Sequence, residues 1–268
     1  MVKTDEHPYL MEHSGEGERL VRKTRAERVI QQARWAGLKP GMRVLDVGCG
    51  AGFTTSLLAE ISGSAEGLDL SLERIESARK SYPELSFHQR DIYQSLEGLG
   101  PYDFIWIRFF LEYHRRSSAE IIQRISGLLA ERGILCVAEL DHHSLNHYPM
   151  DERMQRTLSG LSEYLQKHAD WDPYAGRKLY THFYDAGFEN IELRFDAHHL
   201  IYGKMESVQE SDWLTKLNVA ARKCGYPFDE YEGGFDEFLV DAESLLVNPR
   251  RFTYTPIIIC RGIRPDAR

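Results

Sequence analysis

Residues 44–52 read VLDVGCGAG, a short apolar run that leads directly into three alternating glycines. A branched run of this length is typical of a strand, and the apolar pattern over residues 53–61 predicts a helix directly after the turn. Glycines suit such a turn because they lack a Cβ and let a ligand approach the backbone. The stretch therefore predicts a strand, a turn and a helix that together can hold a ligand.

Strands and helices are predicted to alternate on both sides of this unit. Apolar runs predict strands at residues 66–70, 85–89, 102–107, 134–140, near 188–196 and near 253–261. Helical spacing predicts helices over about residues 17–38, 71–80 and 119–129. This alternation is typical of an α/β fold, a doubly wound, mainly parallel sheet that we expect to have seven strands and to bind ligands at their carboxyl ends.

Two stretches with a mainly helical pattern, residues 141–172 and 204–250, interrupt the alternation. In the first, Met154, Leu158, Leu161 and Leu165 recur at helical spacing. We expect one domain over residues 1–268, with both insertions and an N-terminal segment, residues 1–38, as a cap on it.

Composition excludes several classes of function. The 268 residues carry 33 Lys and Arg against 41 Asp and Glu, a net charge of -8, which argues against nucleic acid as a partner. No run approaches the roughly 20 apolar residues of a membrane span, and the first residues lack the pattern of a secretion signal. The four cysteines lie far apart. We expect a cytoplasmic protein, a monomer or a homodimer, with no membrane contact.

Acidic residues stand at the ends of the first three predicted strands. Asp46 lies two residues before the first glycine, Asp69 ends the second strand, and Asp91 follows the third. A carboxylate beside the turn repels a pyrophosphate and favours a cation, and Phe53 stands where a dinucleotide fingerprint needs its third glycine. Asp69 is placed to accept ribose hydroxyls and Asp91 to accept an adenine amino hydrogen. The pattern favours a positively charged nucleoside without phosphate.

Together these segments resemble class I S-adenosylmethionine-dependent methyltransferases of the small-molecule group. The matching residues are 46–52, 67–71, 90–92, 102–104, 128–135 and, more weakly, 176–188. The resemblance implies a Rossmann-like methyltransferase fold, S-adenosylmethionine as cofactor and a small organic molecule as methyl acceptor.

The resemblance also implies which residues contact the cofactor. The glycine turn would hold the methionine part, Asp69 the ribose, Leu70 the adenine face, and Asp91 with the Ile92 amide the adenine edge. The backbone of Arg108, after the fourth strand, would lie on the sulfonium side. Its side chain would contact the cofactor carboxylate or an acidic substrate, or else face solvent or pair with Glu112. The whole expected set is Tyr9, Arg19, Asp46, Gly48, Cys49, Gly50, Gly52, Asp69, Leu70, Asp91, Ile92 and Arg108. Tyr9 and Arg19 would belong to an entry helix.

Methyl transfer from a sulfonium is an in-line displacement that mainly needs alignment and the exclusion of water. An acceptor that carries a proton also needs a base, for which we favour His114 and His143, near the ends of the fourth and fifth strands. We expect no metal site, because the adjacent histidines at 142–143 and 198–199 match no ligand motif. Aromatic residues that could line an acceptor site are Phe109, Phe110, Tyr113, Tyr148, Trp171, Tyr174, Trp213 and Tyr231.

Two further functions compete with a small-molecule methyltransferase. A regulatory or scaffold protein of the same fold would bind S-adenosylmethionine without catalysis, but it predicts an eroded site, whereas the glycines and the three acids are present. An RNA or protein methyltransferase would want a basic face or a recognition appendage, and the sequence indicates neither. The acceptor molecule and its reacting atom stay open.

Overall fold

The computed structural model describes residues 25–142, 145–205, 211, 213–215, 217–221 and 224–266. Within these ranges one eight-stranded sheet has the order β3-β2-β1-β4-β5-β8-β6, with β7 paired to β8. Its strands are β1 (Val44–Val47), β2 (Glu66–Asp69), β3 (Ser86–Gln89), β4 (Tyr102–Arg108), β5 (Leu129–Leu140), β6 (His147–Tyr148), β7 (Glu189–Tyr202) and β8 (Phe252–Ile263). The first five pair in parallel, and β8 runs antiparallel to β5, β6 and β7.

The expected mainly parallel α/β fold is therefore confirmed, with one strand more than the seven expected. The additional strand is β6, inside the insertion at residues 141–172 that was predicted as helical. It forms because β8 continues past the end of β5, so that His147 and Tyr148 pair with Thr253 and Phe252.

Helices flank the sheet and fill the insertions. They are α2 (Ala26–Ala36), α3 (Phe53–Ser62), α4 (Leu72–Ser81), η1 (Leu111–Tyr113), α5 (Ser118–Ser126), α6 (Glu152–His168), α7 (Ala175–Asp185), the π-helix η2 (Leu217–Ala221) and α10 (Gly234–Val247). The hydroxyl of Ser71 accepts a hydrogen bond from the Arg74 amide at 3.4 Å and so caps α4. The part of the predicted helix before residue 25 lies outside the described residues.

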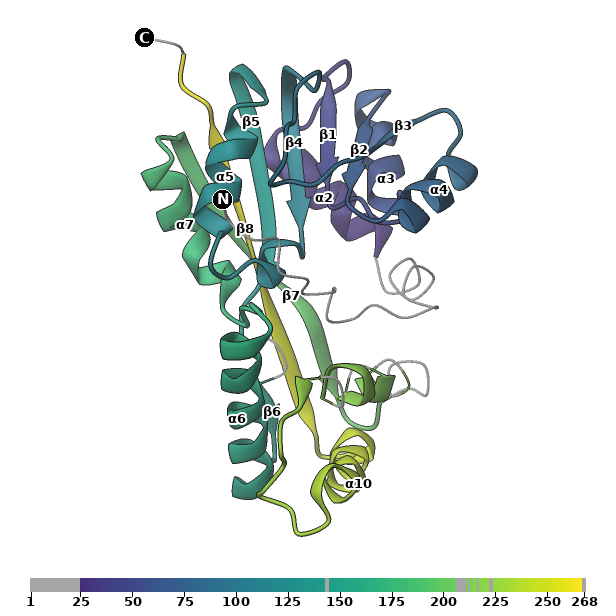
Figure 1. Cartoon of the computed structure of the whole chain (residues 1–268), viewed down its shortest axis with the longest axis vertical. Helices are drawn as coiled ribbons and strands as arrows, with labels where there is room; N and C mark the ends of the chain where they lie inside the picture. The colour runs from purple at the N-terminus through teal and green to yellow at the C-terminus, as the bar shows by residue number, and fades with distance from the viewer. Residues whose placement is uncertain are drawn as a thin grey trace.

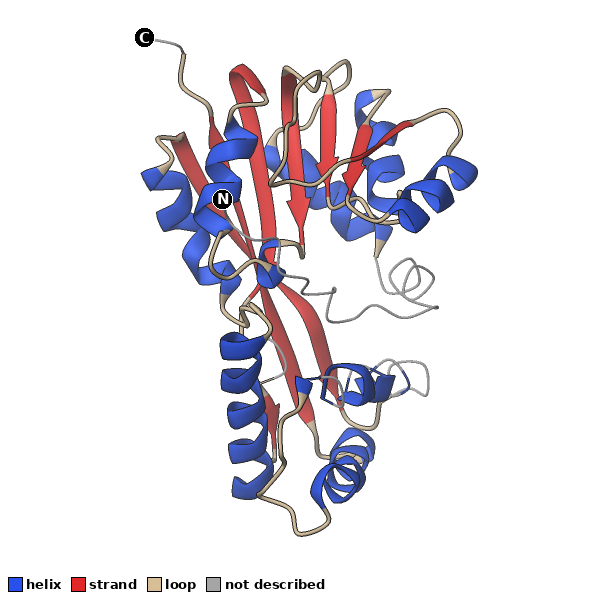
Figure 2. Cartoon of the chain, in the orientation of Figure 1, coloured by secondary structure: helices blue, strands red, loops and turns tan. Residues whose placement is uncertain are grey.

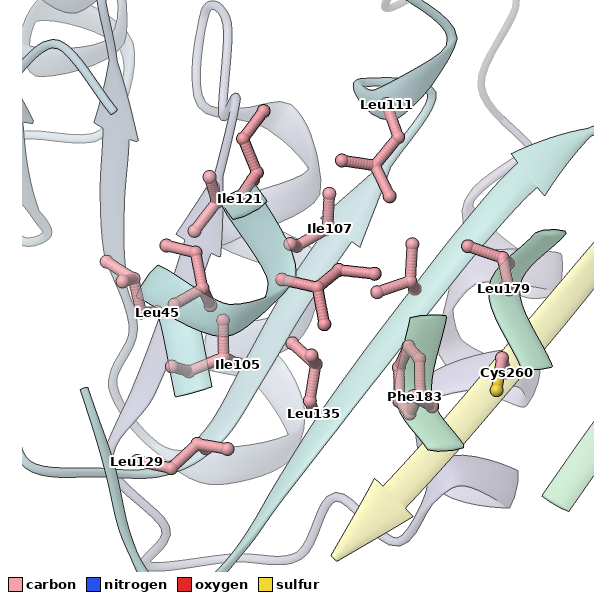
Figure 3. Close-up of a cluster of buried hydrophobic side chains, with 14 of the residues drawn as sticks. Leu45, Ile105, Ile107, Leu111, Ile121, Leu129, Leu135, Leu179, Phe183 and Cys260 are labelled. Carbon is pink, nitrogen blue, oxygen red and sulfur yellow. The ribbon is translucent and has the colours of Figure 1, made fainter. Parts of the chain in front are cut away.

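Apolar side chains cover both faces of the sheet. Leu45, Ile105, Leu135 and Phe183 belong to the cluster between the sheet, α5 and α7, which Figure 3 draws. Neighbouring strand residues, such as Val44, Phe104 and Cys136, point to the other face and pack with α2 and α3. Burial on both faces is the usual environment of a parallel sheet, and it leaves the strand ends as the place for a ligand.

The two insertions lie together beyond the carboxyl ends of the parallel strands. In Figure 1, β4 points downward toward a lower part of the molecule that holds α6, β6 and α10. Figure 2 shows that β7 and β8 continue from the upper part into this lower part as a long ribbon. All four residues that predicted the helix of the first insertion are buried, and they pack with residues of the second insertion such as Phe228 and Phe238. We call this lower part the cap.

Candidate functional site

The turn after β1 is fixed by backbone hydrogen bonds to the neighbouring strand. The amides of Gly48 and Cys49 donate to the Leu68 carbonyl at 2.8 and 3.0 Å, and the Gly52 amide donates to the Cys49 carbonyl at 3.0 Å. Gly48, Gly50 and Gly52 have φ values of 74°, 55° and 86°. Side-chain-bearing residues rarely adopt this left-handed region, which accounts for the three glycines.

The surroundings of the three glycines differ. A Cβ on Gly48 would lie 2.6 Å from the Phe110 ring, and a Cβ on Gly52 would lie 2.8 Å from the Phe87 ring. A Cβ on Gly50 would meet nothing within 4 Å. Gly50 is therefore the member of the turn that borders open space, where a ligand can approach the backbone.

The carboxylate of Asp69 joins this turn to the end of β2. Its Oδ2 accepts a hydrogen bond from the Gly50 amide at 2.9 Å, and its Oδ1 accepts one from the Ser71 amide at 2.9 Å. Each carboxylate oxygen can still accept another hydrogen bond. The next residue, Leu70, is 65% exposed although it is apolar. The end of β2 thus offers an oriented acceptor for hydroxyl groups beside an uncovered apolar surface.

Asp46 is a buried acid on β1, directly before the turn. Its Oδ2 accepts a hydrogen bond from the Thr55 hydroxyl at 2.8 Å, and the residue is 2% exposed. Burial, reinforced by the negative charge of Asp69, raises the pKa of Asp46 to about 7. Because the charged form is poorly compensated, a cation bound beside the turn would stabilise it.

Arg108 ends β4 on the other side of Asp46. Its guanidinium stacks on the Phe109 ring at 4.0 Å, and burial lowers its pKa to about 10 although Asp46, Glu139 and Glu112 oppose that shift. Its Nε is buried without a hydrogen-bond partner among the described residues. The sequence left open whether the Arg108 side chain points to solvent, and the structure shows that it does not.

Glu139, on β5, braces the loop after β4. Its Oε1 accepts hydrogen bonds from the Phe110 and Leu111 amides at 2.9 and 2.7 Å. The side chain is fully buried, and burial together with the charge of Glu112 raises the pKa of Glu139 to about 8. This contact fixes the backbone next to Arg108 and the glycine turn.

Asp91 and His114 lie together after β3 and η1. The carboxylate of Asp91 accepts a hydrogen bond from the Tyr93 amide at 2.9 Å, and the Tyr93 hydroxyl lies 2.8 Å from Nδ1 of His114. Burial lowers the pKa of His114 to about 4, against the charge of Asp91. His114 is therefore neutral near pH 7, with one ring nitrogen engaged by Tyr93.

The remaining predicted residues divide into two groups. The Cys49 thiol packs with Ile75, Ala78 and Phe87 beneath the turn, and the Ile92 side chain lies in the core, so both residues could offer a ligand only their backbone. Tyr9, Arg19 and His143 lie outside the described residues. Sequence reasoning did not single out Thr55 or the Tyr93 hydroxyl as partners of the site, since nothing local marks a contact between separate elements.

The site combines an open glycine turn, two acids near it, an exposed leucine and a third acid at the next strand end. It suits a cationic nucleoside, because it offers carboxylates for hydroxyl and amino groups and, within the ranges that the structure describes, no clustered cations for phosphate. In the described part of the chain, no three His, Cys, Asp or Glu residues are grouped closely enough to hold a metal ion. None of the described helices has the length and apolarity to cross a membrane.

Comparisons with known proteins agree with this architecture. A family model described as "Methyltransferase domain" matches residues 38–187, more than half of the chain. Among curated proteins, the ubiquinone biosynthesis O-methyltransferase of Xanthomonas campestris pv. campestris is 33% identical over 107 residues, which are 38% of this chain and 44% of that protein. The chain thus spans less than half of the length of this relative.

Solved structures resemble the fold over nearly the whole chain. Magnesium protoporphyrin IX methyltransferase from Synechocystis PCC 6803, with S-adenosylhomocysteine bound, has a TM-score of 0.53 and 16% identity, covering 94% of this chain and 88% of its own. A protein named as a cyclase has a TM-score of 0.55 and 17% identity, covering 90% of this chain and 82% of its own. At such identities the likeness concerns the fold alone, which can host different chemistry.

Proposed function

The chain belongs to the family of methyltransferase domains, and from this premise we propose that it is an enzyme that transfers the methyl group of S-adenosylmethionine to an O, N, S or C atom of a small organic molecule. The observation that carries the proposal is the hydrogen bond between the Gly50 amide and Asp69. It presents an open glycine turn and an oriented carboxylate to the same ligand.

The residues of the site fit this cofactor. Asp69 would accept the ribose hydroxyls, Leu70 would pack on the adenine, and Asp91 with the Ile92 amide would hold the adenine edge. The methionine part would lie on the backbone of residues 48–52, where a Cβ on Gly50 would have room. Asp46, whose charge burial disfavours, would be compensated by the positive charge of the ligand.

When bound, S-adenosylmethionine supplies an electrophilic methyl group on a sulfonium. The protein's part is to hold the acceptor atom in line with that methyl group and to keep water away, because the positive charge is lost during transfer. The buried Glu139 supports this geometry by fixing the Phe110 and Leu111 amides. The cap beyond the strand ends is the part of the chain that we propose to cover the acceptor.

The role of His114 as a base stays a prediction, and its contacts favour another role. Tyr93 joins His114 to the loop of Asp91, so His114 lies at the proposed adenine end of the site. We therefore propose that His114 positions that end of the cofactor. His143, the other predicted base, lies outside the described residues.

Other expectations also continue as proposals. The net charge of -8 supports a small molecule and not nucleic acid as the acceptor. Four free cysteines support a reducing, cytoplasmic setting. That the protein is a monomer or a homodimer stays a prediction. The alternative is a protein that binds S-adenosylmethionine without catalysis, and it predicts cofactor binding without any methylated product.

Calorimetric titration with S-adenosylmethionine, S-adenosylhomocysteine and NAD tests the proposal directly. We expect both sulfur compounds to bind and NAD not to bind; binding of NAD alone would overturn the assignment. Incubation of the protein and S-adenosylmethionine with metabolite extracts should then produce compounds heavier by one CH₂ group. Cofactor binding without any methylated product would favour the non-catalytic alternative.

A further inference from the structure

A run of aromatic contacts leads from the proposed cofactor site into the cap. Phe109, next to Arg108, contacts His198 with ring centroids 4.9 Å apart, and His198 contacts His199 at 4.2 Å. Trp213 lies 5.4 Å from His199 and 5.4 Å from His147. We call these five residues the cap track. It begins where β4 ends and follows the β7–β8 ribbon.

The track is tied to one face of β8 by hydroxyl groups. Nδ1 of His199 lies 3.0 Å from the Thr255 hydroxyl, and Nδ1 of His147 lies 2.8 Å from the Thr253 hydroxyl. Thr253 also accepts a hydrogen bond from Arg251 at 2.7 Å. Thr253 and Thr255 alternate along β8 and share one face. Arg251 lies just before β8, and all three residues are 1% exposed. The track therefore ends at the guanidinium of Arg251.

Arg251 is a buried cation without a counter-ion among the described residues. Besides Thr253, its guanidinium donates to the Gly203 carbonyl at 3.1 Å, and Nε has no partner among the described residues. No carboxylate in that part of the chain forms an ion pair with it, and burial alone lowers its pKa. A buried charge is normally paired, because leaving water is costly for it.

Two other arginines, one in the cap and one where the cap meets the sheet, show the usual arrangement. Arg153 pairs with Glu237 and Asp241, and Arg177 makes a two-point contact with Asp141. Arg251 differs in having only neutral acceptors. The missing partner of this buried cation is a negative charge that a ligand can bring.

We propose that Arg251 binds the carboxylate of the methyl acceptor, and that the cap track contacts the acceptor's aromatic or apolar body. The inference rests on the proposed function, since the reacting atom would lie at the Phe109 end. Ile257 pairs with Leu140 at the carboxyl end of β5, and Phe252 begins β8 five residues earlier, about 16 Å away at the rise of a strand. The acceptor is thus an elongated acid whose reacting atom lies far from its carboxylate.

Two matched probes test the charge requirement in the unmodified protein. Phenylbutyrate and phenylbutanol share an aromatic ring and a short chain, but only the first carries a carboxylate. The protein is first saturated with S-adenosylhomocysteine and then titrated with each probe by calorimetry, with time for equilibrium because Arg251 is enclosed. We expect phenylbutyrate to bind about tenfold more tightly or better, the scale of a hydrogen-bonded charge. Equal affinities, or no binding of either probe, would overturn the inference.

Variants then assign the preference to one residue. Arg251→Gln should remove the preference for phenylbutyrate, whereas Arg156→Gln, on the exposed side of α6, should keep it. A preference that survives Arg251→Gln would overturn the assignment. If Arg251→Gln does not fold by circular dichroism, Arg251→Lys, which keeps the charge but not the planar fork, should retain only part of the preference. Absence of S-adenosylhomocysteine binding in the first step would instead overturn the proposed function.

Discussion

The Gly50 amide donates a hydrogen bond to Asp69 Oδ2 at 2.9 Å, across 19 positions of sequence. One residue lies in the turn after β1 and the other at the end of β2. Because Asp69 also accepts from the Ser71 amide, its carboxylate is held in one orientation before any ligand arrives. Such preorganisation lowers the entropy that ligand binding would otherwise cost.

Replacing Asp69 tests whether this carboxylate serves a ligand. Asp69→Asn keeps the shape but places an amide NH₂ opposite a backbone donor, so we expect affinity for S-adenosylhomocysteine to fall by about 1.5–3 kcal/mol. Calorimetry measures the loss. Asp103→Asn is the matched control, because Asp103 accepts from the Arg43 amide near the start of β4, at the opposite end of the sheet. Equal affinity of the two variants would contradict the role of Asp69.

Gly50 and Gly98 form a pair that separates ligand contact from backbone strain. Their φ values are 55° and 83°, and a Cβ on either would meet nothing within 4 Å. Gly50→Ala and Gly98→Ala should therefore lower the free energy of unfolding by similar amounts, about 1 kcal/mol each. Only Gly50→Ala should weaken S-adenosylhomocysteine binding, because the new methyl group would occupy the ligand's space. A loss of binding in both variants would point to strain as the cause.

Local signals explain what the sequence predicts well. The strand at Val44–Val47 and the helix at Phe53–Ser62 lie where the apolar run, the glycines and the helical pattern placed them. The position of the acids at one edge of the sheet can also be predicted, because parallel strands of one sheet end at the same edge. Cys49 shows what local signals do not predict. Its position in the turn does not indicate whether the thiol points toward the ligand or toward the core, and the thiol lies in an apolar cluster.

Features that depend on distant pairing were not predictable. His147 contacts Thr253 across 106 positions, so β6 has no local signature. The strand predicted near 188–196 likewise ends before the last six residues of β7, which pair with the part of β8 beyond the core. Likewise, the contact of Tyr93 with His114 depends on how the loop after β3 folds against η1. Nothing in the sequence distinguishes Arg251 from a surface arginine, because its burial depends on how the β7–β8 ribbon and the cap helices pack.

The raised pKa of Asp46 makes a prediction about pH. In the unfolded chain this carboxyl ionises near pH 3.8, and in the folded protein near pH 7. Its contribution to stability is therefore full below pH 4 and is lost as the pH rises toward 7. Relative to Asp46→Asn, the wild-type free energy of unfolding should fall over this range by at most about 4 kcal/mol.

Urea unfolding of both proteins at several pH values measures this difference, in which the other titrating groups cancel. Thr55→Val supplies a second comparison, because the Thr55 hydroxyl bonds to Asp46 and lowers its pKa. Without that bond the fall should become larger. Parallel stability curves for wild type and Asp46→Asn would show that Asp46 is ionised throughout.

The contact of Asp141 with Arg177 joins the end of β5 to the first turn of α7, where the sheet meets the cap. Both N–H···O distances are 2.8 Å, and Asp141 is only 7% exposed. Removing the guanidinium leaves a buried carboxylate without its partner, so Arg177→Met should lower the free energy of unfolding by about 1–3 kcal/mol. Arg156→Met, which breaks the exposed contact with Glu152 at 3.8 Å, should change it by no more than about 0.5 kcal/mol.

A double-mutant cycle separates the energy of the Asp141–Arg177 contact from the cost of leaving the Asp141 carboxylate without a partner. Asp141→Asn in the Arg177→Met background removes the charge, so it should recover part of the lost stability, although the same change alone is destabilising. Additive effects would mean that the two side chains stabilise the protein independently. The opposite sign of Asp141→Asn in the two backgrounds is the specific signature of an ion pair whose acid is buried, because an acid in an exposed pair stays in water when its partner is removed.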